Sequence, residues 1–185
     1  MLLTDVYQTT VVQGGIPIDH YMTLTMSSIG KLNDLVGGVP VTILEDFTAK
    51  DSRMAVGNEV LLNGWQALLY VNGRQDIADG TNLNRMSRQE QYLLAFYKQF
   101  LKKSQEEGAD FLARVLINVG PSFQSDLDFE GLNELRKILP SCKLMPFQSL
   151  KGEQVLGEDV YEYYVDEEAL QQQIVDLFYE QITLD

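Results

Sequence analysis

The chain has 185 residues, of which 45% are hydrophobic and 22% are charged, a composition typical of a globular protein with enough apolar surface for a core. Its net charge of −13 argues against a nucleic acid or an anionic membrane as the main partner, because both would repel the average surface. With one cysteine, no visible signal peptide and no apolar run of membrane-spanning length, we expect a cytoplasmic protein, or a virion protein if the chain is a phage component.

The first part of the chain is expected to be rich in antiparallel strands. Strands are predicted over residues 2–12, 18–26 and 39–47, with a short helix over 27–36 between the last two. In the second strand, alternation places His20 on the more apolar side. We therefore expect that side to be buried and His20 to be packed against it.

A hairpin is predicted around Asn63-Gly64, because Asn-Gly suits the two left-handed positions of a type I′ turn. Its strands are expected over 59–62 and 65–71. A second Asn-Gly at residues 72–73 predicts a third strand near 74–77.

The stretch from Ser87 to Pro121 predicts one long helix followed by one buried strand. Ser87 and Glu90 have the spacing of a capping box, and apolar residues follow at three- and four-residue steps up to Gly108. Residues 111–119 alternate in a way typical of a strand that is covered on much of both faces.

The last third of the chain is expected to alternate helices and strands. A helix capped by Ser125, Asp126 or Asp128 and stopped by Pro140 would precede a short strand, which predicts a right-handed parallel crossover. The remaining predicted elements are a strand over 142–147, a loop over 148–158, a strand over 159–165 and a final helix capped by Asp166. The fold class is therefore α+β, with an antiparallel β-rich N-terminal half that contains hairpins, a C-terminal half of alternating helices and strands, and one domain over 1–185; pure α/β is the alternative.

The motifs of common catalytic and cofactor sites are missing from the sequence, so no catalytic residue, cofactor or metal is predicted. A zinc site could draw only on His20 and Cys142. A packed, hydrogen-bonded histidine and a buried, unreactive thiol are the simpler interpretations of these two residues.

One ligand-binding region is predicted by position, at the end of the predicted strand over 111–119. Two of its carboxylates could hold a divalent cation, although helix capping explains the same residue types without a ligand. The candidate residues are Asn118, Ser122, Asp126 and Asp128.

An interaction surface is predicted near the C-terminus, where residues 151–185 hold ten acidic residues and one basic residue, a net charge of −9. Tyrosines with an apolar body and a polar tip are common in protein interfaces. The alternative is a solvated acidic surface. The candidate residues are Tyr161, Glu162, Tyr163, Tyr164, Glu167 and Glu168.

These observations favour a non-enzymatic protein–protein interaction or assembly protein, such as a structural subunit of a phage particle, whose partner is a basic protein or further copies of itself. The first alternative is an acidic inhibitor, immunity or anti-defence protein that masks a basic active site. The second is a small metal-assisted enzyme that uses the region from Asn118 to Asp128.

Overall fold

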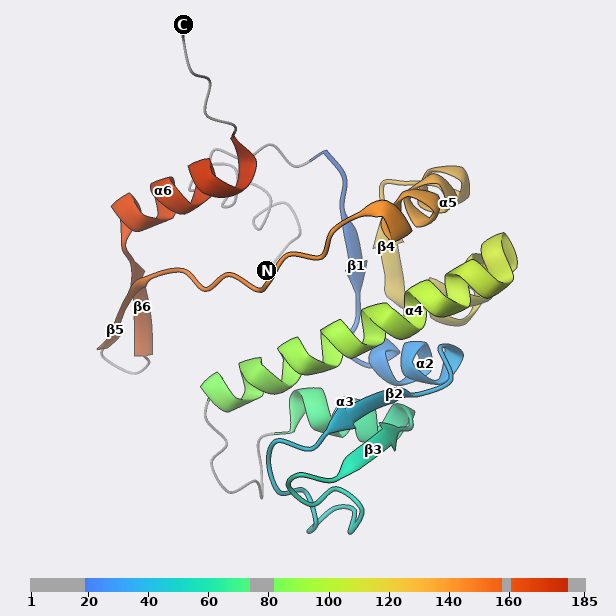
Figure 1. Cartoon of the computed structure of the whole chain (residues 1–185), viewed down its shortest axis with the longest axis horizontal. Coiled ribbons are helices and arrows are strands. Elements are labelled where there is room, and N and C mark those ends of the chain that lie inside the picture. Colours follow the sequence, from blue (N-terminus) through green and yellow to red (C-terminus); the bar gives the residue numbers. More distant parts are fainter. Residues whose placement is uncertain (1–18, 74–81, 158–160, 180–185) are drawn as a thin grey trace, which may run out of the picture. The chain divides into compact units, whose positions relative to one another are not determined.

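The structure is a computed structural model that describes residues 19–73, 82–157 and 161–179. It divides into two compact units, one over residues 20–143 and one formed by 144–185 with 1–19 (Figure 1). The first unit holds β1 (Met22–Leu24), α2 (Ser28–Leu35), β2 (Val39–Thr42), β3 (Glu59–Leu62), α3 (Gly64–Asn72), α4 (Asn82–Val119), β4 (Phe123–Ser125) and α5 (Phe129–Ile138), with 3-10 turns at Gly120–Ser122 and Leu139–Ser141. The second holds β5 (Gly152–Leu156), β6 (Tyr161–Val165) and α6 (Glu167–Phe178).

These elements confirm the predicted α+β class with short antiparallel sheets. β1 pairs with β4, β2 with β3 and β5 with β6, and each described sheet has two strands. The predicted parallel crossover is therefore wrong, since every described pair is antiparallel. That the chain forms a single domain over 1–185 stays a prediction.

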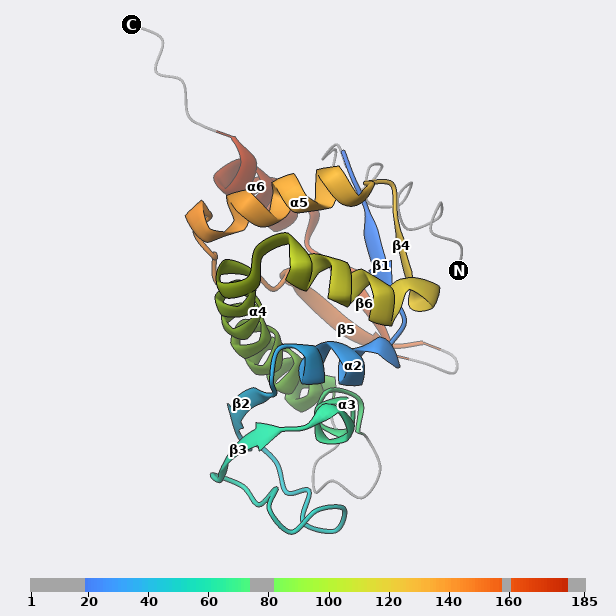
Figure 2. The same cartoon turned by 90° about the vertical axis from the view of Figure 1, so that its right-hand side faces the viewer.

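The core of the 20–143 unit forms where α4 lies against α2, α3 and β2 (Figures 1 and 2). Tyr92 near the start of α4 and Phe111, Val115 and Val119 near its end are all buried at helical spacing. Strand β2 adds alternate buried residues and α3 adds the fully buried Tyr70. This packing fixes the first turns of α4 against strand and helix neighbours.

The 144–185 unit is different, because none of its described residues is buried. β5 and β6 form a hairpin, and Asp166 accepts a hydrogen bond from the Ala169 amide to cap α6, as the sequence predicted. Apolar side chains such as Leu156 and Phe178 are 65% and 60% exposed. No described helix of either unit combines the length and the apolar character that crossing a bilayer requires.

Asn63-Gly64 is not a hairpin turn, and the predicted strand over 65–71 is wrong. Asn63 caps α3: its side chain accepts from the Gln66 amide at 3.0 Å, while Gln66 Oε1 accepts from the Asn63 amide at 3.0 Å. The predicted strand over 59–62 exists, but it pairs with β2 through Val39 and Leu62. The spacing Asn-x-x-Gln is a capping box, which here outweighs the turn preference of Asn-Gly.

The predicted strand over 111–119 is also wrong, because these residues continue α4. At Gly108 the backbone leaves the helical region, with φ of 63° and ψ of −136°, and Figure 2 shows α4 changing direction along its length. The predicted helix stop is thus a kink rather than an end. The buried residues 111, 115 and 119 fit a strand and a helix equally well, since each step of four is even.

Several other predictions are confirmed. The short helix over 27–36 is α2, and the helix after Pro121 is α5, which Asp128 caps by accepting from the Gly131 amide at 2.9 Å. β6 confirms the late strand. In contrast, residues 142–147 form no strand, and the predicted loop over 148–158 contains β5.

The remaining predicted strands are those over 18–26, 2–12 and 74–77. Met22 and Leu24 are 53% and 45% exposed, so the apolar side of the predicted strand over 18–26 is not buried. The predicted strands over 2–12 and 74–77 lie outside the described residues.

Helices α2 and α3 approach closely where two glycines face each other. A Cβ on Gly64 would lie 2.5 Å from the Gly30 carbonyl oxygen and 2.6 Å from Asp34 Oδ2. The Gly64 amide also donates to Asp34 Oδ1 at 2.7 Å. A side chain at this position would therefore have to push the helices apart.

We expect Gly64→Ala to lower the free energy of unfolding by about 1–3 kcal/mol, the usual cost of overpacking. Urea denaturation measures this change. Gly120→Ala is the matched control, since a Cβ there meets nothing within 4 Å. Equal stability of the two variants would show that the contact between Gly30 and Gly64 is not a constraint.

Candidate functional site

An apolar groove of about 410 Å³ lies in the 20–143 unit, beside the first half of α4. The α4 wall is one helical face with residues at positions 89, 92, 93 and 96, while α2, α3 and the segment from β1 into α2 form the rest. Its lining residues are Leu24, Met26, Ile29, Leu32, Val71, Gln89, Tyr92, Leu93 and Phe96.

The groove is open to solvent although it is lined almost entirely by carbon. Leu24, Met26 and Leu93 are 45%, 46% and 51% exposed. Large apolar side chains that gather around one hollow indicate a binding site for an apolar ligand more than a solvated surface.

The floor of the groove is held by hydrogen bonds to buried polar groups. The Tyr92 hydroxyl bonds to Asn33 Oδ1 at 3.3 Å, and Asn33 Nδ2 donates to the Leu62 carbonyl at 2.7 Å. Gln89, the one amide in the lining, donates its Nε2 to the Val71 carbonyl at 2.9 Å. Burial raises the pKa of the Tyr92 hydroxyl, so it stays neutral and serves as a fixed wall.

A buried arginine anchors the N-terminal part of α4 next to the groove. Arg88 is fully buried; it forms an ion pair with Glu45 and its guanidinium carbon lies 5.2 Å from the Phe47 ring centroid. Its Nε donates to the Tyr70 carbonyl at 2.8 Å and its Nη2 to the Gly73 carbonyl at 2.7 Å. Desolvation lowers the pKa of Arg88 from its ordinary value, yet a guanidinium stays charged in proteins.

The neighbours of this pair form a second hydrogen-bonded layer. The Tyr70 hydroxyl donates to Gln91 Oε1 at 2.6 Å, and Gln91 Nε2 donates to the Thr42 carbonyl at 3.0 Å. Burial raises the pKa of Tyr70 to about 12, which keeps this hydroxyl a donor. Strand β2, α3 and α4 are thus joined by hydrogen-bonded side chains that have little freedom to move.

A second cation, Arg85, lies on α4 just before the residues that line the groove. It precedes Gln89 by four residues and so lies one turn back on the same face of α4. Arg85 Nε is buried, and among the described residues no group accepts a hydrogen bond from it. This guanidinium therefore has a donor that no described group uses.

The predicted ligand-binding residues lie in the same unit but form no metal site. Asp126 accepts from the Tyr21 amide at 2.9 Å and lies 3.1 Å from His20 Nδ1, and these two contacts, the amide first, lower the pKa of its carboxyl. Asn118 donates to the Arg114 carbonyl at 2.8 Å. No group of three or more histidine, cysteine or acidic residues could hold a metal in the described ranges.

The remaining members of this prediction also have local roles. The Ser122 carbonyl accepts a hydrogen bond from the Thr25 amide at 3.1 Å. Asp128 caps α5, as the capping alternative predicted. His20 is exposed rather than packed, and Cys142 is exposed rather than buried, so both simpler interpretations were wrong about burial. Ligand binding by the four candidates stays a prediction.

The predicted interaction residues lie on β6 and in the first turn of α6. The Tyr163 hydroxyl donates to the Leu150 carbonyl at 2.8 Å and that of Tyr164 to Glu162 Oε2 at 2.7 Å, and both rings are more than half exposed. Tyr161 lies in β6, and Glu167 and Glu168 are exposed. A binding role for this set of six stays a prediction.

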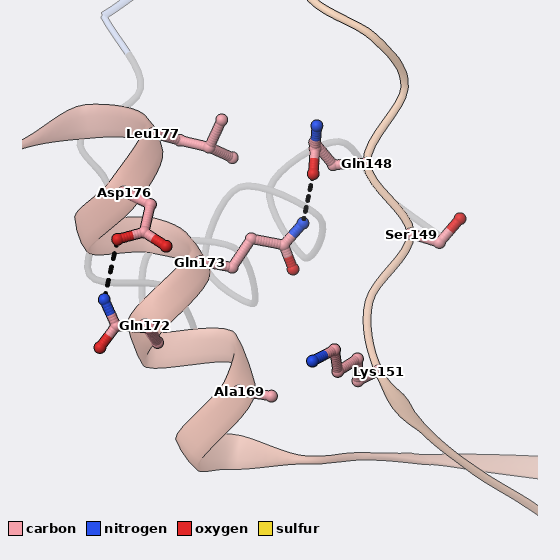
Figure 3. Close-up of a pocket in the computed structure, with 8 residues that line it drawn as sticks. All are labelled: Gln148, Ser149, Lys151, Ala169, Gln172, Gln173, Asp176 and Leu177. Carbon is pink, nitrogen blue, oxygen red and sulfur yellow. Dashed lines mark hydrogen bonds between the residues drawn. The ribbon is translucent and has the colours of Figure 1, made fainter.

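A larger hollow of about 550 Å³ lies between α6 and the segment over 148–151, within the 144–185 unit (Figure 3). Polar side chains dominate its walls, and two amides meet across it, with Gln173 Nε2 donating to Gln148 Oε1 at 3.3 Å. Since its walls are exposed and no buried core supports them, we place the candidate site in the apolar groove instead.

Comparison with solved structures defines the class of fold first. Bacillus subtilis TagU has a TM-score of 0.68 and 19% sequence identity, with 99% of this chain and 74% of that chain covered. The model of the LytR_cpsA_psr family matches residues 5–178. The chain therefore belongs to the LytR_cpsA_psr family.

Two named relatives show what members of this family are called. One, from Halalkalibacterium halodurans, is 33% identical over 121 residues, which cover 65% of this chain and 38% of the relative. The other, from Bacillus mycoides, is 28% identical over 159 residues, which cover 84% of this chain and 50% of the relative. Both are named polyisoprenyl-teichoic acid–peptidoglycan teichoic acid transferase TagU, and this chain spans half of their length or less.

Family membership overturns the function expected from the sequence. An assembly or phage structural protein and an acidic inhibitor, immunity or anti-defence protein are wrong, because the relatives are named transferases of a cell-wall polymer. A role of the 118–128 region in an enzyme stays a prediction. The expected protein partner is wrong as well, since the relatives are named for polyisoprenyl-linked teichoic acid and peptidoglycan.

Sequence reasoning missed three charged residues of this region, Glu45, Arg85 and Arg88. A usable signal existed: Arg85 and Arg88 stand three residues apart around the start of the predicted helix, and Glu45 lies in the predicted strand over 39–47. Buried charges of opposite sign usually pair, so these residues could have been expected to meet.

Proposed function

We propose that this chain binds a polyisoprenyl-linked glycopolymer and takes part in its transfer to a cell-wall acceptor. The observation that carries this proposal is the apolar groove of α4, with Arg85 one turn before Gln89 on the same helix. The family of the chain and the names of its relatives support the same substrate class.

The groove suits the tail of such a substrate. An isoprenoid chain has no polar atoms, and it would cover Leu24, Met26 and Leu93, which are otherwise about half exposed. Removing this carbon surface from water drives binding without specific polar contacts.

Arg85 suits the headgroup. A phosphate group where tail and polymer join would lie beyond the groove end at Gln89, one helical turn from Arg85. The Arg85 guanidinium offers the planar donor pattern that phosphate oxygens accept. Arg88 does not take this role, because its side chain is fully buried and bound to Glu45 and two backbone carbonyls. In a transfer reaction at phosphorus, a fixed guanidinium at this place would stabilise the charge that develops on the oxygens.

Titration calorimetry with geranylgeranyl phosphate, geranylgeraniol and inorganic phosphate tests this proposal. We expect the phosphate ester to bind at least about ten-fold more tightly than the alcohol, because a charge-assisted hydrogen bond contributes roughly 1.5–3 kcal/mol. Inorganic phosphate alone should bind weakly, since it leaves the groove empty. Equal binding of ester and alcohol, or no binding of either, would contradict the proposal.

A further inference from the structure

The two ends of the groove differ in chemistry. Arg85 precedes the groove on the side of the start of α4. At the other end, Phe96 is the last lining residue on α4, and the next position on the same face is Phe100. A ligand with a charged head and an apolar tail can therefore enter in one orientation.

Beyond Phe96, the same face of α4 continues in aromatic rings that contact one another. The ring centroids of Phe96 and Phe100 lie 6.0 Å apart, and those of Phe100 and Phe111 lie 5.4 Å apart. Phe111 is fully buried, so this row of rings runs from the groove into the core. On the other side of Phe96, the Tyr92 ring stacks on it with the two centroids 6.1 Å apart. Phe96 is thus supported on both sides along α4.

We propose that the groove measures a fixed length of isoprenoid, about two to four units next to the headgroup, and that Phe96 is the stop. This inference rests on the proposed function, because it assigns the tail to the groove. It adds the chain length that the site recognises and the residue that sets it.

The volume of the groove gives an upper estimate of the number of isoprene units that it holds. The hollow holds about 410 Å³. An isoprene unit occupies on the order of 100 Å³ at the packing density of protein interiors, so about four units fit.

The length of the α4 wall gives a lower estimate of the number of isoprene units. Gln89 and Phe96 are seven residues apart, which corresponds to about 10 Å along a helix. Three backbone bonds of an extended peptide reach about 3.5 Å, so the four bonds of an isoprene unit reach roughly 4.5 Å. A straight chain along this wall therefore places two to three units.

Binding of a series of isoprenyl phosphates from five to thirty carbons, measured with the 185-residue chain, tests the proposal. We expect Kd to fall roughly ten-fold or more for each added unit that is buried, and to become constant within about three-fold beyond about ten to twenty carbons. A fall that continues at the same rate to thirty carbons would overturn the length limit and leave the proposed function standing. Failure of every length to bind would overturn both.

Phe96→Ala tests the stop itself. The variant removes a ring of nearly the size of one isoprene unit, so the plateau should begin one unit later than in the unchanged protein. Phe129→Ala is the matched control, since Phe129 is 46% exposed on α5 and does not line the groove. If circular dichroism shows that Phe96→Ala is unfolded, Phe96→Leu takes its place with a smaller shift in the same direction. A plateau that does not move in a folded variant would overturn the role of Phe96.

Discussion

Arg88→Ala is expected to lower the free energy of unfolding by about 3–5 kcal/mol, the largest effect of any single substitution considered for this chain. The change removes a fully buried cation and leaves Glu45, whose side chain is 10% exposed, without its partner. It also leaves the Tyr70 and Gly73 carbonyls without their donor. Guanidinium chloride denaturation followed by circular dichroism measures the loss.

Arg114→Ala is the matched control, because Arg114 makes the same kinds of contact at the surface. It pairs with Glu107 and its guanidinium lies 5.8 Å from the Phe111 ring centroid, but its side chain is 46% exposed. Water screens an exposed pair, so we expect a loss below about 1 kcal/mol. Equal losses in the two variants would mean that burial of the Arg88 ion pair does not set its contribution.

Arg85→Ala is expected to weaken binding of geranylgeranyl phosphate by about ten- to a hundred-fold while leaving stability nearly unchanged. The expected factor is that of one or two charge-assisted hydrogen bonds, and Arg85 has no ion pair among the described residues to lose. Titration calorimetry and thermal unfolding together measure the two effects. Binding of geranylgeraniol, which lacks the phosphate, should not change.

Lys98→Ala removes the same unit of charge from an exposed position on α4 and serves as the control. Arg85→Lys separates charge from geometry, since lysine keeps the charge without the planar fork. We expect Arg85→Lys to recover part of the affinity. A loss of equal size in Arg85→Ala and Lys98→Ala would assign the effect to overall charge rather than to this site.

The sequence predicted the elements that have one strong local signal. Asp128 and Asp166 precede helices whose first amide donors they accept, and both helices were expected from these caps. Asn63-Gly64 failed because the same two residues suit a hairpin turn and a helix start. Only the tertiary contact of Gly64 with Gly30 and Asp34 decides between them.

The groove could not be predicted, because it joins residues from α2, α3, α4 and the segment from β1 into α2. Its α4 face was predicted as a helix stripe, but such a stripe is ordinarily covered by core. Nothing in the spacing of Leu24 and Met26 indicates that they would stay exposed beside it. The partner of an apolar stripe is a property of the fold rather than of the helix.

The charge argument concerns only the average surface. A net charge of −13 describes the average surface, whereas the proposed headgroup site depends on one guanidinium, Arg85, one helical turn before an apolar groove. The average charge, which argues against a nucleic acid or an anionic membrane as main partner, therefore says little about a local site for one phosphate group. The cytoplasmic localisation that was inferred from composition stays a prediction.

Photo-crosslinking with a geranylgeranyl phosphate that carries a diazirine at its tail end tests the central claim most directly. Mass spectrometry of the digested protein then locates the modified residues. If the groove holds the isoprenoid tail with its phosphate at Arg85, the label falls on peptides that contain Phe96 or the α2 wall, and excess unlabelled geranylgeranyl phosphate suppresses it. Labelling concentrated in residues 144–179, or labelling that competitor does not reduce, would contradict the claim.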